Sequence, residues 1–191
     1  MVASARHGTV HQLNVSGGGV PKLPVEEARV RLDGMDGDAQ ADRRHHGGPE
    51  RALCLFALER IEEFQAEGHT IAPGSAGENV TIAGLDWSSV VPGARLRLGS
   101  EVLVEVSSYT APCNKNAQWF AGGDFNRMNH QTHPGCSRVY ARVLQEGTVR
   151  SGDAVELIEE RAADRVWRAQ PTTYRWSPPG DQDRGQEARN G

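Results

Sequence analysis

A cysteine in the middle of the chain is the first residue whose setting suggests chemistry. Cys113 directly follows a proline, shortly after the strand-like run 102–106. Because proline fixes φ and carries no backbone N–H, we expect the strand to end there, with the thiol at its rim. A thiolate is a nucleophile and a ligand for soft or high-valent metals, and Lys115, Arg127 and Arg138 are the cationic candidates to stabilise it. The pattern leaves two interpretations open, a reactive thiol and a small half-buried residue.

The two other cysteines suggest different roles. Cys54 lies in the apolar run LCLF, which predicts an inert core residue. Cys136 follows His130 and His133 at intervals of three, and Cys113 could complete a zinc set of two cysteines and two histidines. Strong zinc patterns have closely spaced ligands at both ends, and here one end offers a single cysteine, so zinc is the weaker alternative. An odd cysteine count of three also argues against a disulfide framework.

Residues 36–48, which we call the acidic–histidine segment, have almost no apolar periodicity. Acidic and amide side chains alternate along its first half, so in an extended backbone they share one side. Such groups could bind a metal, transfer protons or hold a heterocycle, and the alternative is a solvated loop. A glycine pair at its end would allow close backbone approach to a ligand. The candidate residues are Asp38, Gln40, Asp42, His46, Gly47 and Gly48.

A second glycine-containing turn, residues 74–79, precedes a strand-like run. Its candidate residues are Gly77, Glu78 and Asn79. Backbone N–H groups in such a turn could cradle a phosphate, although an ordinary turn is the default interpretation.

The elements that must position these residues are mostly short strands. Runs of alternating or apolar residues predict strands at 9–15, 28–32, 52–56, 78–82 and 139–144, and strand pairs within 90–106 and 148–158. A helix is expected over 57–67, and a single helix from Pro49 to Glu67 is the alternative. Many turns between short strands predict a mainly β fold, either a β-barrel with a few short helices or an α+β domain.

Composition limits the range of functions. A formal net charge of −4 and a pI near 6.0 provide no basic field for a nucleic acid. No apolar run reaches the roughly 20 residues that span a bilayer, and the first residues do not resemble a signal peptide, so we expect a cytoplasmic protein without a membrane partner. One domain over 1–160 and a polar C-terminal extension over 161–191, flexible and partly disordered, are expected.

Several separated blocks occur in an order that carries a family resemblance. GDAQADRRHHGG, GSAGENVTIAGLDW, a strand pair, APC and HPGCSRVYARV follow one another between about Val10 and Ile158. Together they resemble the MOSC domain, the C-terminal domain type of molybdenum cofactor sulfurases, and in particular its stand-alone YiiM-like members. An aromatic residue is common in this family where Cys136 stands, which raises the alternative that Cys136 resolves an oxidised Cys113.

The resemblance implies a MOSC-type β-barrel that binds the molybdenum cofactor (molybdopterin), with Cys113 as the molybdenum ligand. It implies a reductase of N-hydroxylated bases or related small molecules that receives electrons from a separate flavin or iron–sulfur protein. A non-catalytic carrier of persulfide sulfur or of the cofactor is the alternative, and pyridoxal phosphate binding is possible in the family. Asp38, Asp42 and His46 are the implied proton donors. The implied cofactor contacts are Gln40, Gly47, Gly48, Gly77, Glu78, Asn79, Lys115, Arg127 and Arg138.

Overall fold

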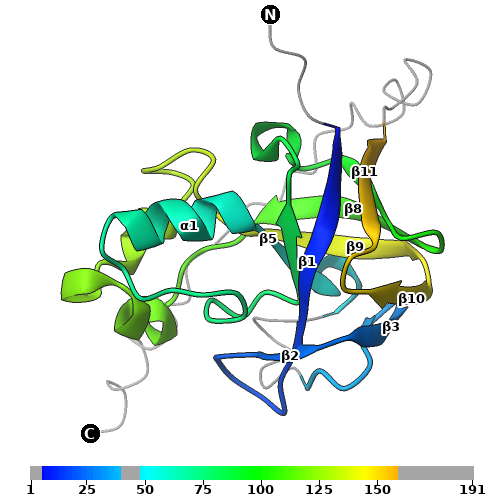
Figure 1. Ribbon diagram of the computed structural model, residues 1–191, viewed down its shortest axis with the longest axis horizontal. Helices are drawn as coiled ribbons and strands as arrows, with labels where there is room; N and C mark the ends of the chain where they lie inside the picture. Colours follow the sequence, from blue (N-terminus) through cyan, green and yellow to red (C-terminus); the bar gives the residue numbers. More distant parts are fainter. Residues whose placement is uncertain (1–5, 40–47, 159–191) are drawn as a thin grey trace, which may run out of the picture. The chain divides into compact units, whose positions relative to one another are not determined.

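The computed structural model describes residues 6–39 and 48–158, and its centre is a closed ring of seven strands (Figure 1). Around the ring the order is β1 (His7–Val15), β11 (Ala154–Ile158), β7 (Arg95–Leu98), β8 (Val102–Tyr109), β9 (Val139–Gln145), β5 (Leu53–Ala57) and β6 (Val80–Ala83). Neighbouring strands are antiparallel except β5 and β6, which are parallel. A parallel pair needs a crossover connection, and α1 (Leu58–Ala66) lies in that connection.

Shorter elements surround the barrel. β2 (Leu23–Val25) pairs with the second half of β1, and a small sheet joins β10 (Gly147–Arg150), β3 (Glu27–Arg31) and β4 (Gly34–Met35). Five short 3₁₀ helices occur in the described part of the chain: η1 (Pro49–Arg51), η2 (Trp87–Ser89), η3 (Asn114–Trp119), η4 (Ala121–Gly123) and η5 (Phe125–Met128). The last three fill the connection between β8 and β9, directly after Cys113.

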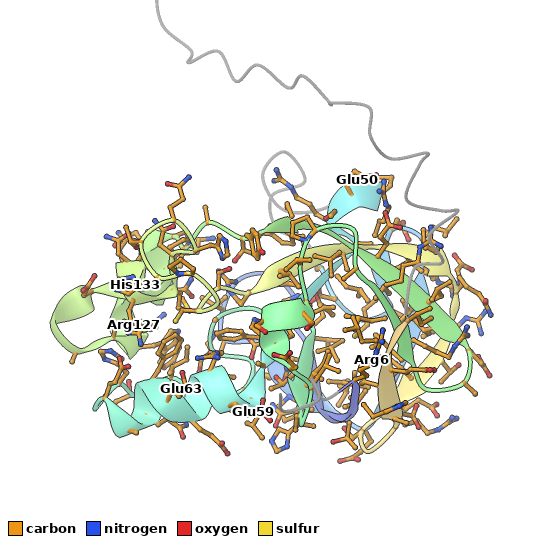
Figure 2. The ribbon with its side chains drawn as sticks, turned by 90° about the horizontal axis from the view of Figure 1, so that it is seen from above. Arg6, Glu50, Glu59, Glu63, Arg127 and His133 are labelled. Carbon is orange, nitrogen blue, oxygen red and sulfur yellow. The ribbon has the colours of Figure 1, made fainter. Side chains whose placement is uncertain are left out.

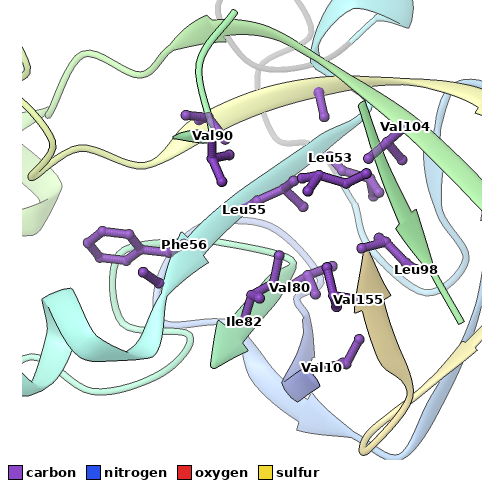
Figure 3. Close-up of a cluster of buried hydrophobic side chains, with 14 of the residues drawn as sticks. Val10, Leu53, Leu55, Phe56, Val80, Ile82, Val90, Leu98, Val104 and Val155 are labelled. Atoms are coloured by element: carbon purple, nitrogen blue, oxygen red, sulfur yellow. The ribbon is translucent and has the colours of Figure 1, made fainter. Parts of the chain in front are cut away.

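The barrel interior is an aliphatic core. Alternate residues of each strand point inward, and Figure 3 shows Leu53 and Leu55 of β5 in one cluster with Val80 of β6, Val104 of β8 and Val155 of β11. All five are fully buried. The remaining positions of β5 face outward, where the rest of the protein covers them.

The outer side of β5 carries the helix. Phe56 points away from the barrel and contacts Phe64 of α1, with ring centroids 6.3 Å apart, and Trp87 of η2, at 6.5 Å. Ile61 and Phe64 are the buried residues of α1, three positions apart, so one stripe of the helix packs on the barrel. The chain leaves the helix through Gly68, whose φ of 92° favours glycine.

The mainly β barrel with few helices is confirmed, and the predicted strands match the observed ones to within a few residues. A single helix from Pro49 was the wrong alternative, because Leu53–Ala57 is a strand. All five residues of this strand are buried, some against the barrel interior and Phe56 against Phe64 of α1. β8 extends to Tyr109, beyond the predicted end. Within the described ranges no helix is long and apolar enough to cross a membrane. Residues 161–191 lie outside the described ranges, so a separate extension stays a prediction.

Candidate functional site

Cys113 lies where β8 has ended and the next segment begins. Beyond β8, the amide of Thr110 still donates to the carbonyl of Arg138 at 3.0 Å, and Cys113 then caps η3 in an extended conformation. Its carbonyl accepts the amide of Asn116 at 2.9 Å. The thiol is free and the residue is half-buried. The position is the one that the Pro-Cys pattern predicted, at the rim of the barrel.

Tyr140 lies on the outer face of the barrel, between Ser108 of β8 and Cys54 of β5 in the strand register. The guanidinium of Arg51 lies over its ring, 5.5 Å from the centroid. Burial raises the pKa of Tyr140 to about 12, and negative charge on Cys54 or Cys113 acts in the same direction. The phenol is therefore neutral at physiological pH.

Cys54 is buried, as its apolar run predicted, but its surroundings are polar. Its amide donates to Oδ1 of Asn79 at 3.1 Å, and its Sγ lies 4.0 Å from Nη1 of Arg138. Burial raises the pKa of the Cys54 thiol, against the opposing charge of Arg138. We therefore expect a protonated thiol beside a guanidinium group.

Arg138 is 7% exposed, and its Nη1 donates to the carbonyl of Ala76 in the 74–79 turn. Its Nε has no hydrogen-bond partner among the residues that the structure describes. The same guanidinium therefore contacts the turn and faces Cys54 of β5.

Asp38 is at the centre of a buried polar network. One carboxylate oxygen accepts the amide of Ser16 at 2.9 Å, and the other accepts Nδ2 of Asn79 at 2.9 Å and forms an ion pair with Lys22. Oδ1 of Asn79 in turn accepts the hydrogen bond of the Cys54 amide. Both oxygens of Asp38 thus act as acceptors, an arrangement that favours a positioning role over proton donation.

Glu78 is fully buried, and one of its oxygens accepts the amide of Gly74 at 2.7 Å and the hydroxyl of Thr81 at 3.2 Å. Its other oxygen has no partner within the described ranges. Burial raises the pKa of Glu78, although the Gly74 amide and the charge of Arg138 oppose the shift. The amides of Ser75 and Gly77 donate to backbone carbonyls, so the turn is largely bonded to itself.

Most of the residues described above lie within the part of the chain that matches a known family. The family model of the MOSC domain matches residues 42–156, more than half of the chain. The chain belongs to the MOSC domain family. This family is associated with binding of the molybdenum cofactor.

The chain is also similar to three curated proteins. The chain is similar to protein YiiM of Escherichia coli, 32% identical over 172 residues that cover 84% of this chain and 75% of YiiM. It is 36% identical over 144 residues to an uncharacterized protein, YflK of Bacillus subtilis, and the match covers 73% of this chain but only 63% of YflK. A reductase of Gibberella moniliformis is 29% identical over 133 residues, which cover 66% of this chain and 23% of the reductase.

Solved structures place the fold in the same group. The crystal structure of YiiM from Geobacillus stearothermophilus matches with a TM-score of 0.64 and 28% identity, over 80% of this chain and 75% of that one. YiiM from Escherichia coli matches with a TM-score of 0.60 and 26% identity, over 80% and 71%.

Not all predicted site residues of this MOSC chain lie together. Arg127 donates two hydrogen bonds to the carboxylate of Glu67, at 2.8 and 2.6 Å, and one to Sγ of Cys136 at 3.0 Å. Figure 2 shows Arg127 and His133 at the α1 end of the molecule, away from Glu50 of η1. Glu67 and Cys136 are thus the partners of Arg127, and its contact with a phosphate stays a prediction.

The remaining predicted residues are only partly described. Lys115 is exposed on η3, and Gly48 precedes η1 with a φ of 82°. Gln40, Asp42, His46 and Gly47 lie outside the described residues, so their roles stay predictions.

The described cysteines and histidines of the zinc alternative do not form a metal site. Within 6–39 and 48–158, no group of three or more His, Cys, Asp or Glu side chains is placed to hold a metal ion. His130 instead stacks on Tyr109, with centroids 3.5 Å apart and planes at 10°, and Cys136 accepts the hydrogen bond from Arg127.

Lys22 and Tyr140 are the site residues that sequence reasoning missed. Lys22 lies in a turn without periodicity, and its ion pair forms with a carboxylate sixteen residues away. Tyr140 resembles any aromatic strand residue, and only the register places it between Ser108 and Cys54.

Proposed function

We propose that this MOSC protein binds the molybdenum cofactor through Cys113 and reduces N-hydroxylated bases or related compounds. The observation that carries the proposal is the free, half-buried thiol at the barrel rim, within the segment that matches the family. Electrons would come from a separate flavin or iron–sulfur protein. Binding of pyridoxal phosphate and a cytoplasmic location stay predictions.

The donor set of the described residues fits this cofactor. A thiolate is a soft donor of the kind that molybdenum accepts, and none of the described side chains forms a cluster that would hold a metal alone. Cys113 would therefore supply the one protein ligand, and the cofactor would bring its own sulfur donors and the redox chemistry. Lys115, Arg127 and Arg138 stay the predicted cationic contacts for its phosphate.

The reaction consumes two electrons and two protons, because R–NH–OH becomes R–NH₂ and water. Within this scheme Cys113 would hold the cofactor at the rim, and Tyr140, on the outer face of the barrel, would contribute a neutral phenol. Asp38 and Lys22 hold the backbone of β5 through Asn79. Asp42 and His46 remain the candidate proton donors.

Molybdenum analysis of protein from a cofactor-competent host tests the proposal. We expect close to one molybdenum per chain in the wild type and a loss of at least tenfold in Cys113→Ser. Reduction of an N-hydroxylated base by a chemical electron donor should fall with it. Cys136→Ser is the matched control, because it removes a thiol that contacts Arg127 and should leave the molybdenum content unchanged.

Two results would count against this function. Equal molybdenum in Cys113→Ser and wild type would remove Cys113 as the ligand. Absence of molybdenum, together with a sulfane-sulfur adduct on Cys113 in the intact mass, would support the carrier alternative instead.

A further inference from the structure

His69 lies between the end of α1 and the 3₁₀ segment that follows Cys113. Its side chain is 12% exposed. Its ring packs beside Phe64 of α1, with centroids 6.4 Å apart, and beside Phe120, at 4.7 Å. These two aromatic contacts hold the imidazole in a defined orientation, so each ring nitrogen faces a particular group.

One ring nitrogen accepts a backbone hydrogen bond. The amide of Ala121, the first residue of η4, donates to Nδ1 of His69 at 3.1 Å. A backbone amide N–H can only donate, so Nδ1 must present its lone pair. In a neutral imidazole one nitrogen carries the proton and the other accepts, so the proton of neutral His69 is on Nε2.

The other ring nitrogen faces a carboxylate. Nε2 lies 3.7 Å from Oε2 of Glu67, the residue that caps the end of α1. Two hydrogen bonds from Arg127 of η5 hold the pKa of Glu67 below its ordinary value, so this carboxylate is charged at neutral pH. His133 is a further titratable group in the field of Glu67. The residues of η4, Ala121–Gly123, carry no charged side chain.

A second contact holds the same segment without a titratable group. The amide of Thr70, the residue after His69, donates to the carbonyl of Trp119 at 2.9 Å. Ala121 is exposed, so its amide can bind water when the imidazole does not accept it. His69 thus holds η4 through a group that can take up a proton, whereas Thr70 holds the end of η3 through backbone atoms alone.

We propose that His69 is a pH-sensitive latch that attaches η4 to the end of α1 while its ring is neutral and releases η4 when its ring is protonated. The added proton occupies Nδ1, which then becomes a donor that faces the amide donor of Ala121. Two N–H groups cannot bond to each other, so the contact is lost. On the other side of the ring, the new positive charge is attracted by Glu67. The segment between Cys113 and β9 therefore has a pH-dependent attachment to the helix.

NMR spectroscopy of the full-length, ¹⁵N-labelled protein tests the latch directly. A scalar coupling across the N–H···N bond should link the nitrogen of Ala121 to Nδ1 of His69 while the ring is neutral. We expect this coupling to disappear as the ring signals of His69 show protonation, between about pH 8 and pH 5. The protection of the Ala121 amide against solvent exchange, corrected for the intrinsic rate, should fall about three- to tenfold. The Thr70 amide should keep its protection.

His69→Asn is the matched variant. Oδ1 of an asparagine can accept the Ala121 amide in place of Nδ1, but it does not titrate, so the protection of Ala121 should no longer depend on pH. His133→Asn is the control, because it removes a second histidine near Glu67 and leaves the contact between His69 and Ala121 in place. It should reproduce the loss of protection seen in the wild type.

The latch would be overturned by unchanged protection of Ala121 while the ring of His69 protonates, or by a proton on Nδ1 in the neutral ring. A ring that stays neutral down to the pH of unfolding would also overturn it. An equal loss of protection in His69→Asn would assign the effect to another group. These measurements use no cofactor and no electron donor, so their outcome does not depend on the proposed function.

Discussion

The ion pair of Lys22 and Asp38 is the contact on which the polar network outside the barrel depends. Their side chains are 12% and 2% exposed, so both charges are largely removed from water. A buried pair is compensated only while both partners are present. Through Asn79 the pair reaches the backbone of Cys54, which links it to the strand beside Tyr140.

We expect Lys22→Met and Asp38→Asn each to lower the free energy of unfolding by about 3 kcal/mol, because each leaves one buried charge unpaired. The double variant should lose clearly less free energy of unfolding than the two single variants lose together. Urea denaturation of the four proteins measures the coupling. Additive losses would show that the two charges do not depend on each other.

Glu78 gives a prediction about pH. Burial raises its pKa in the folded state above the unfolded value near 4.5, so its favourable contribution is complete below that value and is lost as the pH rises through the folded pKa. Glu78→Gln keeps a neutral side chain that can accept from Gly74. We expect the wild type to lose up to about 1.4 kcal/mol per pH unit in that window relative to the variant. Parallel stability curves from pH 4 upward would contradict a raised pKa.

Residue types alone named part of the candidate site. Cys113 was a candidate because proline and cysteine follow a strand, Asp38 because carboxylates alternate along its segment, and Glu78 and Asn79 because they follow glycines at the start of a strand. The roles of these groups could not be predicted, since each depends on a partner distant in sequence. Asp38, for example, is held by Ser16 and Asn79, 22 and 41 residues away.

Among the elements, the 74–79 turn is fixed by close backbone approach. Gly74 has a φ of 84°, and a Cβ there would collide with the carbonyl of Lys22. The amide of Lys22 also donates to the carbonyl of Gly74 at 2.9 Å. The turn that carries Glu78 is thereby attached to the turn that carries Lys22.

Gly74→Ala should therefore destabilise the protein by more than 3 kcal/mol, because it adds a backbone collision to conformational strain. Gly68→Ala is the control, since Gly68 has a φ of 92° and open space around its Cβ position. It should cost about 1–2 kcal/mol. Thermal and urea unfolding compare the two, and equal losses would mean that the close approach adds nothing.

Elements with strong periodicity were predictable, and the others were not. α1 and the strands of the barrel follow from their apolar spacing. The 3₁₀ helices between β8 and β9 are too short to produce a pattern, so the polar run after Cys113 did not predict them.

At the scale of the whole molecule, closure of the barrel depends on the two ends of the described chain. β1 pairs with β11, with Gly8 opposite Val155. No local spacing can specify a pairing between residues so distant in sequence. The residue pattern within β5 or β6 does not specify that these two strands pair in parallel. The helix between them is compatible with such a pairing.

Two truncations separate the barrel from the predicted C-terminal extension. A chain that ends at residue 160 keeps β11, and we expect it to unfold at the wild-type urea midpoint with unchanged molybdenum content. A chain that ends at residue 152 lacks β11, which leaves β1 and β7 without their shared partner and exposes the core around Val10 and Leu98. Its cooperative transition should be lost. A lower midpoint for the 160-residue chain would contradict a separate extension, because residues 161–191 would then contribute to the stability of the barrel that positions Cys113.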